Sequence, residues 1–144
     1  MFVGIDFGIT NTDIAVWSND KYNFFSLPSQ AIDNHFLSKI FDFIKINTTD
    51  ISKIAVTGGK SSDLNNSFKN ISIVKVNEVS AIGYGAMELD KIKDDNFVVV
   101  SAGTGTACIS CSNGEFNYLG GISVGGGTLQ GLSNLIIENN NADD

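Results

Sequence analysis

The chain has 144 residues, of which 42% are hydrophobic and 17% are charged. This composition supports a hydrophobic core and excludes a wholly disordered chain. No apolar run approaches the roughly 20 residues of a membrane span, and residues 1–6 lack the basic segment of a signal peptide. We therefore expect a cytoplasmic protein that does not associate with membranes. The net charge of −7 excludes a general nucleic-acid binder, because such a protein needs a basic face.

The start of the chain predicts an antiparallel meander followed by a helix. Three short apolar runs predict the strands of the meander: residues 2–5, 14–17 and 22–27. Pro28 ends the third strand, and Ser29 is a candidate N-cap for the segment that follows. Apolar side chains then recur at helical spacing, which predicts an amphipathic helix over about residues 30–46.

The rest of the chain alternates predicted strands and helices. Apolar runs predict three more strands, at residues 54–56, 71–76 and 97–100, with a helix over about 77–92. Strands at 108–111 and 116–119 flank an Asn-Gly pair, which predicts a tight hairpin. A last helix is expected over about 128–137, before a polar tail at 139–144.

Two segments of the chain resemble each other. Residues 1–17 and 97–111 each run from a strand through a turn of glycine and threonine, Gly8-Ile9-Thr10 or Gly103-Thr104-Gly105-Thr106, into a returning strand. This repetition predicts a duplicated α/β fold, with a first lobe over residues 1–96 and the beginning of a second lobe over 97–144. We expect the second lobe to be represented by its hairpin, its glycine-rich loop and one helix.

The two cysteines form a C-x-x-C pair at Cys108 and Cys111. A structural zinc site requires four ligands, and His35, the single histidine, belongs to a predicted helix far upstream. A redox pair would need a helix N-terminus to lower the thiol pKa. The sequence around the pair predicts a strand, on which residues three apart point to opposite faces. We therefore interpret both cysteines as ordinary strand residues.

Two turns rich in glycine and threonine are candidate phosphate-binding loops. The first is Asp6-Phe7-Gly8-Ile9-Thr10, and the second is Gly103-Thr104-Gly105-Thr106. Glycine lets the backbone approach a phosphate closely, threonine supplies a hydroxyl and an N–H, and an aspartate can hold magnesium or its waters. Each turn alone is also consistent with an ordinary tight turn. Together they indicate a two-loop site, with a phosphate or nucleotide tail between them.

Residues 120–132 contain the densest glycine cluster. Gly125, Gly126 and Gly127 precede the last predicted helix, where consecutive glycines are expected to expose a run of N–H donors. A flexible loop is the alternative, but Leu129 and Leu132 directly behind favour a docked helix. Little else in the predicted second lobe covers these side chains. We therefore expect self-association as a homodimer, or pairing with a C-terminal half.

Taken together, these motifs resemble type II pantothenate kinases. The matching segments are Gly4-Ile5-Asp6-x-Gly8-x-Thr10, Thr57-Gly58-Gly59, Glu78-Val79-x-Ala81, Gly103-Thr104-Gly105-Thr106 and Gly120-Gly121-x-x-x-Gly125-Gly126-Gly127-Thr128-x-x-Gly131-Leu132. The resemblance covers about residues 1–137 and matches the N-terminal half of such an enzyme. It implies an actin-like ATPase (ribonuclease H-like) α/β lobe with the start of a second lobe. It also implies a kinase, usually a dimer, that transfers the ATP γ-phosphoryl group to the hydroxyl of pantothenate, the first step of coenzyme A biosynthesis.

The resemblance further implies roles for individual residues. The ATP phosphates would be bound by Asp6, Gly8, Thr10 and Asn11 in the first loop and by Gly103, Thr104, Gly105 and Thr106 in the second. Asp6 would also hold the magnesium ion (Mg2+). The substrate would contact Gly121, Gly125, Gly126 and Gly127. Glu78 falls where the family places its catalytic carboxylate, which accepts the hydroxyl proton. A carboxylate stabilised by a helix dipole is the alternative interpretation of Glu78.

Four positions depart from the family pattern. Ile9 replaces a glycine of the first loop, Asp13 replaces a lysine, Ala107 replaces a serine and Tyr118 replaces an arginine. A carboxylate at position 13 would repel a triphosphate unless it turns away or binds a metal. Two alternatives therefore stay open. The protein is a kinase for another small hydroxyl substrate, or it is a non-catalytic module that binds a nucleotide or coenzyme A.

Overall fold

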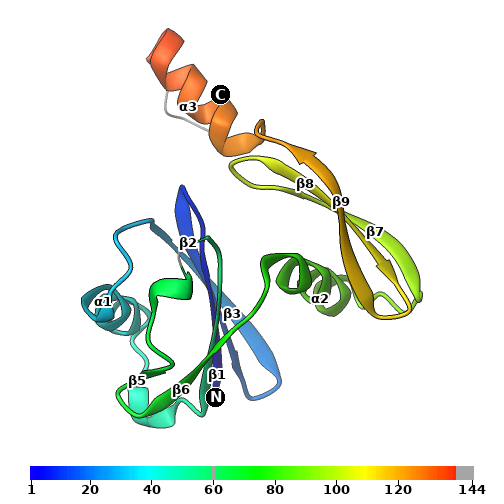
Figure 1. Ribbon diagram of the computed structural model, residues 1–144. Coiled ribbons are helices and arrows are strands. Elements are labelled where there is room, and N and C mark those ends of the chain that lie inside the picture. Colours follow the sequence, from blue (N-terminus) through cyan, green and yellow to red (C-terminus); the bar gives the residue numbers. More distant parts are fainter. Residues whose placement is uncertain (60, 139–144) are drawn as a thin grey trace. The chain divides into compact units, whose positions relative to one another are not determined.

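The structure is a computed structural model that describes residues 1–59 and 61–138 (Figure 1). Contacts divide the chain into two compact units, the first ending at Glu78 and the second beginning at Val79. Helix α2 (Glu78–Asp90) therefore falls almost wholly in the second unit. The lobe boundary after residue 96 stays a prediction, and the polar tail at 139–144 lies outside the described residues.

The first unit is built on one mixed sheet. Its elements are β1 (Phe2–Phe7), β2 (Asn11–Ser18), β3 (Lys21–Pro28), α1 (Asn34–Ile44), the short 3-10 turns η1 (Thr48–Asp50) and η2 (Ser61–Asp63), β4 (Lys53–Thr57), β5 (Ser67–Phe68) and β6 (Ile71–Lys75). The strand order is β3-β2-β1-β4-β6-β5. The first three strands form the predicted antiparallel meander, and β4 and β6 continue the sheet in parallel with β1.

Helix α1 confirms the predicted amphipathic helix but begins later than expected. Its N-cap is Asp33, whose carboxylate accepts a hydrogen bond of 2.7 Å from the backbone N–H of Phe36. Ser29 is not the cap, so that interpretation was wrong. Its hydroxyl instead donates to the Gly8 carbonyl, and residues 29–33, which are neither strand nor helix, separate it from the start of α1 at Asn34. Lys45 ends the helix in a left-handed conformation, with φ of 56°.

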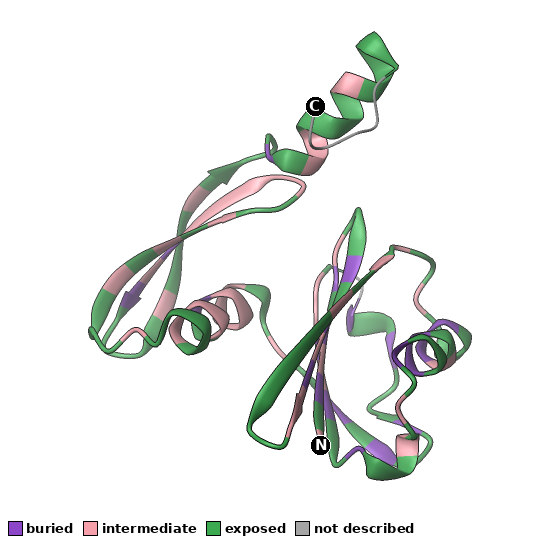
Figure 2. Ribbon diagram, turned by 180° about the vertical axis from the view of Figure 1, so that it is seen from behind, coloured by how far each residue is buried: buried purple, intermediate pink, exposed green. Residues whose placement is uncertain are grey.

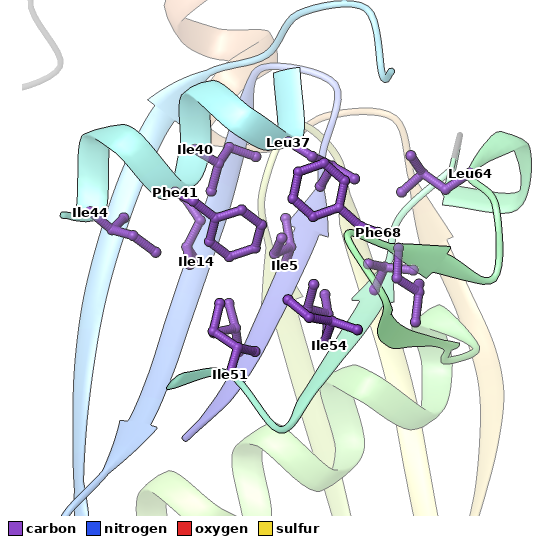
Figure 3. Close-up of a cluster of buried hydrophobic side chains, with 14 of the residues drawn as sticks. Ile5, Ile14, Leu37, Ile40, Phe41, Ile44, Ile51, Ile54, Leu64 and Phe68 are labelled. Atoms are coloured by element: carbon purple, nitrogen blue, oxygen red, sulfur yellow. The ribbon is translucent and has the colours of Figure 1, made fainter. Parts of the chain in front are cut away.

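One face of this sheet and the inner face of α1 form the core of the first unit. Alternate residues of β1 and β2 point into it, as the two-residue period of a strand requires. Figure 3 shows α1 side chains packed over the isoleucines of the sheet. The fully buried members include Ile5, Ile14, Leu37, Ile40 and Ile54. Figure 2 shows that most of the buried residues belong to this unit.

The second unit is a three-stranded antiparallel sheet with two helices. Its strands, in the order β7-β8-β9, are β7 (Asn96–Ala102), β8 (Thr106–Ser112) and β9 (Glu115–Ile122), and α3 (Gly126–Ile137) follows them. The predicted Asn-Gly hairpin is confirmed, with positive φ at Asn113 (49°) and Gly114 (80°). Gly83 lets α2 approach β9 closely, since a Cβ there would overlap the Phe116 ring.

Three smaller predictions can also be compared. Cys108 and Cys111 both lie in β8 as free thiols, as predicted. Strand β5 was not among the predicted strands, because two residues give no periodic signal. No helix within residues 1–59 and 61–138 is long and apolar enough to span a membrane.

The packing of α1 predicts a stability difference between two substitutions on the same helix. Leu37→Ala removes a fully buried side chain and should lower the free energy of unfolding by about 2–5 kcal/mol. Lys39→Ala, at an exposed position, should change it by about 0.5 kcal/mol or less. Urea unfolding followed by circular dichroism measures both. Equal effects would contradict the placement of this helix on the core.

Candidate functional site

The turn between β1 and β2 is a compact loop held by the end of β3. The Ser29 hydroxyl donates to the Gly8 carbonyl at 2.6 Å, and the Ser29 backbone N–H donates to the Thr10 carbonyl at 3.0 Å. A Cβ at Gly8 would lie only 2.7 Å from the Asn11 carbonyl oxygen, so glycine is required there. Ile9 stands at the tip of the turn with 86% of its surface exposed. The first predicted phosphate loop is therefore rigid at its base.

Strand register places Asp6 beside two other polar side chains. Asp6 pairs with Asp13 across the antiparallel β1–β2 ladder and with Thr57 across the parallel β1–β4 ladder. Residues in register share a face, so all three lie on the face opposite the α1 core. The Thr57 hydroxyl is buried and has no hydrogen-bond partner in the part of the chain that the structure describes.

Gly58 directly follows β4 and lies close to Asp6 and Phe7 of β1. Its backbone has φ of +92°, which favours glycine. A Cβ at this position would lie 2.8 Å from the Asp6 Oδ1 atom and would overlap the Phe7 carbonyl. The Thr57-Gly58-Gly59 motif is thus explained by the close approach of the β4 end to Asp6.

The electrostatics of Asp6 are unfavourable to its charged form. Partial burial of the carboxyl group, followed by the negative charges of Glu78 and Asp13, raises the pKa of Asp6 above its ordinary value. Asp13 and Glu78 therefore both act on the predicted phosphate-loop carboxylate. Such a cluster is stabilised by a proton or a cation. No group of three or more His, Cys, Asp or Glu side chains within the described ranges is arranged to hold a metal ion by itself.

The second predicted phosphate loop is fastened to the start of α3. Gly127 donates its N–H to the Gly103 carbonyl at 3.1 Å, and Thr128 donates its N–H to the Thr104 carbonyl at 3.2 Å. The Thr128 hydroxyl reinforces the second contact at 2.7 Å. A further hydrogen bond of 2.8 Å joins the Thr106 hydroxyl to the Val124 carbonyl. The loop and the glycine-rich segment thus form one substructure.

This packing corrects one expectation from the sequence. The glycines before α3 were expected to expose a run of free N–H donors, but the N–H groups of Gly127 and Thr128 are already engaged by the 103–106 loop. Gly125 is needed for close backbone approach, since a Cβ there would lie 2.5 Å from the Gly105 oxygen and 2.7 Å from the Gly103 oxygen. The sequence could not show this use of the donors, because it depends on a long-range contact.

The remaining predicted residues lie at the edges of these two substructures. Glu78 begins α2 directly after β6, and its charge acts on Asp6. Gly121 lies opposite Ala107 in the β8–β9 ladder, and a Cβ at Gly121 would lie 2.6 Å from the Tyr118 hydroxyl. Sequence reasoning missed Ser29 as the support of the first loop, and only its position after the third strand could have indicated that role.

Comparison with solved structures identifies the fold. The activator of 2-hydroxyisocaproyl-CoA dehydratase from Clostridium difficile, solved with bound ADPNP, matches 95% of this chain and 52% of its own, with a TM-score of 0.67 and 17% identity. A putative N-acetylglucosamine kinase from Porphyromonas gingivalis matches 96% of this chain and 55% of its own, with a TM-score of 0.61 and 18% identity. The predicted actin-like ATPase and sugar-kinase fold is therefore confirmed.

Comparison with curated sequences shows which proteins of this fold the chain resembles in sequence. A type II pantothenate kinase from Bacillus anthracis is 36% identical over 138 residues, which cover 93% of this chain and 48% of that enzyme. A type II pantothenate kinase from Oceanobacillus iheyensis is 25% identical over the same share of this chain. No family model matches. The resemblance to the N-terminal half of type II pantothenate kinases is confirmed, and the chain spans about half the length of the curated relatives it matches.

The packing of Gly125 generates a testable contrast with its neighbour. Gly125→Ala forces a methyl group against two carbonyl oxygens and should cost about 1–3 kcal/mol of stability in the second unit. Gly126→Ala meets nothing closer than 3.8 Å at the first turn of α3, and should be neutral or stabilise by up to about 1 kcal/mol. Thermal unfolding compares the two variants. Equal stabilities would refute the close approach of the loop to the helix start.

The raised pKa of Asp6 predicts a pH-dependent effect on stability. Its native pKa lies above the ordinary value of 3.8, so the folded state binds the proton more tightly than the unfolded state. The stability gained from this proton is present below the ordinary pKa and is lost as pH rises through the raised pKa. Asp6→Asn should therefore be more stable than wild type at pH 7, and the difference should shrink toward pH 3. Urea unfolding across this range tests the sign, and Asp20→Asn, in an exposed turn, controls for the amide itself.

Proposed function

We propose that the protein takes part in ATP-dependent transfer of a phosphoryl group to pantothenate. The observation that carries this proposal is the 36% identity to type II pantothenate kinase over 93% of the chain. Two features of the structure support it. The rigid β1–β2 turn and the 103–106 loop are both glycine-containing turns at the start of an antiparallel hairpin, a geometry suited to phosphate oxygens.

We propose ATP as the nucleotide. Two solved relatives of the same fold were determined with ATP analogues, the dehydratase activator with ADPNP and a glucokinase from Streptomyces griseus with AMPPNP. In this chain the first loop would bind phosphate through Gly8, Thr10 and Asn11. The second would bind through residues 103–106, whose backbone is already ordered by the contacts with Thr128. Preordered donors reduce the entropy lost on binding.

The carboxylates of the first unit fit a magnesium ion bound together with phosphates. Mg2+ prefers oxygen ligands and usually takes one or two carboxylates while keeping several waters. Asp6 is the proposed ligand or water-orienting group. Asp13 lies in register beside it, as does Thr57, whose hydroxyl has no hydrogen-bond partner among residues 1–59 and 61–138. When bound, the ion would neutralise charge on the triphosphate, which the net charge of −7 otherwise repels.

Glu78 is the proposed general base. It stands at the first position of α2, directly after the sheet of the first unit. In the reaction its carboxylate would accept the proton of the pantothenate hydroxyl. The hydroxyl oxygen then forms the new bond to the γ-phosphorus, while the bond to the β-phosphate oxygen breaks and ADP leaves. Its electrostatic interaction with Asp6 supports a role in the same site.

The acceptor end is proposed to involve Gly121, Gly125, Gly126 and Gly127. Gly121 and Gly125 serve close packing, so we propose that they shape the loop and contribute few direct hydrogen bonds. We also propose a cytoplasmic location for this activity. The exposed apolar side chains of α3 support association with a second copy or with a C-terminal half.

A second candidate function is favoured by one specific observation. Asp13 faces Asp6 in register, so two carboxylates share the corner where a triphosphate would bind. This arrangement weakens ATP binding unless a cation intervenes. A non-catalytic module that binds a nucleotide or coenzyme A need not hold a triphosphate in position for transfer, so it would tolerate this arrangement better.

Substitution of Glu78 separates these functions. If the protein turns over ATP and pantothenate, Glu78→Gln should lower kcat by about 10²–10⁴-fold, because a positioned base is lost. The Kd for ATP should stay within about threefold, since the carboxylate does not hold the nucleotide. A coupled assay for ADP and isothermal titration calorimetry measure the two quantities. Wild-type ATP binding without any turnover would favour the non-catalytic module, and turnover by Glu78→Gln close to wild type would remove Glu78 from the mechanism.

A further inference from the structure

Ser29 connects the end of β3 to the turn between β1 and β2 through its side chain as well as its backbone. Its hydroxyl donates to the Gly8 carbonyl at 2.6 Å, and its N–H donates to the Thr10 carbonyl at 3.0 Å. A third contact joins the Ser29 Oγ atom to the Thr12 Oγ1 atom at 3.4 Å. Ser29 therefore contacts three residues in or directly after the first predicted phosphate loop.

The two hydroxyls and the Gly8 carbonyl form a hydrogen-bond chain with one direction. A serine hydroxyl carries a single proton, and the short contact with the Gly8 carbonyl uses the proton of Ser29. In the contact between the two hydroxyls, Thr12 is therefore the donor and Ser29 is the acceptor. Thr12 is only 1% exposed, so water competes little for its hydroxyl. Hydrogen bonds in such a chain polarise and strengthen one another.

The contacts with Ser29 fix the orientation of two peptide groups in the turn. In a trans peptide group, the C=O bond and the N–H bond of the next residue point in opposite directions. The carbonyls of Gly8 and Thr10 both point toward Ser29. The N–H groups of the next residues, Ile9 and Asn11, therefore point away from it. Backbone N–H groups directed to one side of a turn suit a phosphate oxygen.

The exposure of Ile9 fits this arrangement. Its side chain is 86% exposed, and its backbone does not adopt the left-handed conformation that favours glycine. Gly8, in contrast, must lack a Cβ, which would lie 2.7 Å from the Asn11 carbonyl oxygen. The turn thus requires glycine at position 8 and accepts isoleucine at position 9, where the N–H group rather than a small side chain is available to a ligand.

We propose that Ser29 is a positioning residue for nucleotide binding and that the Thr12 hydroxyl supports it. The pair holds the Gly8 carbonyl toward the end of β3, so that the N–H groups of Ile9 and Asn11 are directed at a phosphate oxygen before the nucleotide binds. Donors fixed in advance lose less entropy on binding. The family resemblance assigned no role to Ser29 or Thr12. The inference rests on the proposed ATP binding and is independent of phosphoryl transfer.

Substitutions of Ser29 in the whole chain test the positioning role. Ser29→Ala removes the donor to the Gly8 carbonyl, so binding of ATP with magnesium should weaken about tenfold in isothermal titration calorimetry. Ser29→Thr keeps a hydroxyl and should bind within about threefold of wild type. Ser38→Ala is the matched control, because the Ser38 hydroxyl also donates to a backbone carbonyl, that of Asn34 in α1. It should bind as wild type does. Titration of fully folded protein separates positioning from stability, since a merely structural role would lower the unfolding midpoint and leave the Kd unchanged.

Amide NMR of the wild-type chain identifies the donors and does not depend on the folding of a variant. On saturation with ATP and magnesium, the amide protons of Ile9 and Asn11 should shift downfield and exchange with solvent more slowly, because a phosphate oxygen accepts hydrogen bonds from them. Both changes should be smaller in Ser29→Ala and should return in Ser29→Thr.

The results that overturn the inference differ from those that overturn the kinase function. Wild-type affinity in Ser29→Ala, an equal loss in Ser38→Ala, or saturable ATP binding without change at the Ile9 and Asn11 amides would overturn the inference. Absence of ATP binding by the wild-type chain would overturn it together with the proposed nucleotide. ATP binding with the expected shifts but without turnover would support the inference and contradict the kinase function.

Discussion

The burial of one face of β1 beneath α1 is the constraint on which the site of the first unit depends. Side chains alternate along a strand, so placing Val3, Ile5 and Phe7 in the core sends Asp6 to the opposite face. The β1–β2 and β1–β4 registers then fix Asp13 and Thr57 beside it. A slip of one residue would bury the carboxylate and expose the core side chains. The packing energy of the core therefore holds the unfavourable charge cluster in position.

In the second unit, backbone contacts rather than core packing hold the candidate phosphate loop. Its glycine loop is ordered by backbone contacts with the start of α3, and those contacts require the absence of side chains at Gly105 and Gly125. The glycine cluster thus costs chain entropy on folding but permits carbonyl and N–H groups to meet directly. This explains why the densest glycine segment of the sequence leads into a helix with no side-chain cap. The two candidate phosphate loops are rigid for unrelated physical reasons.

Local patterns were sufficient to predict the meander, α1, the Asn-Gly hairpin and the two glycine loops, because each depends on periodicity or turn chemistry within a few residues. The role of Ser29, the engagement of the Gly127 N–H and the approach of Gly58 to Asp6 depend on contacts between distant segments. The composition of the chain and the spacing of its motifs do not reveal contacts between distant segments. The family resemblance predicted more than the local patterns did. Several motifs in a known order indicate which distant segments belong to one fold, whereas a single turn motif does not. The assignment of Gly121 and Gly125 to substrate binding by this resemblance stays a prediction, and the structure adds that both glycines permit close backbone packing.

We propose that both glycine loops bind the phosphates of a nucleotide. Backbone amide NMR of the whole chain during titration with ATP and magnesium tests it most directly. The account predicts saturable shifts at residues 8–11 and at residues 103–106 in the same titration, with little change at the exposed hairpin turn of Asn113 and Gly114. Shifts confined to one loop would reduce the site to a single phosphate turn. Saturable binding that leaves both loops unshifted would contradict the account.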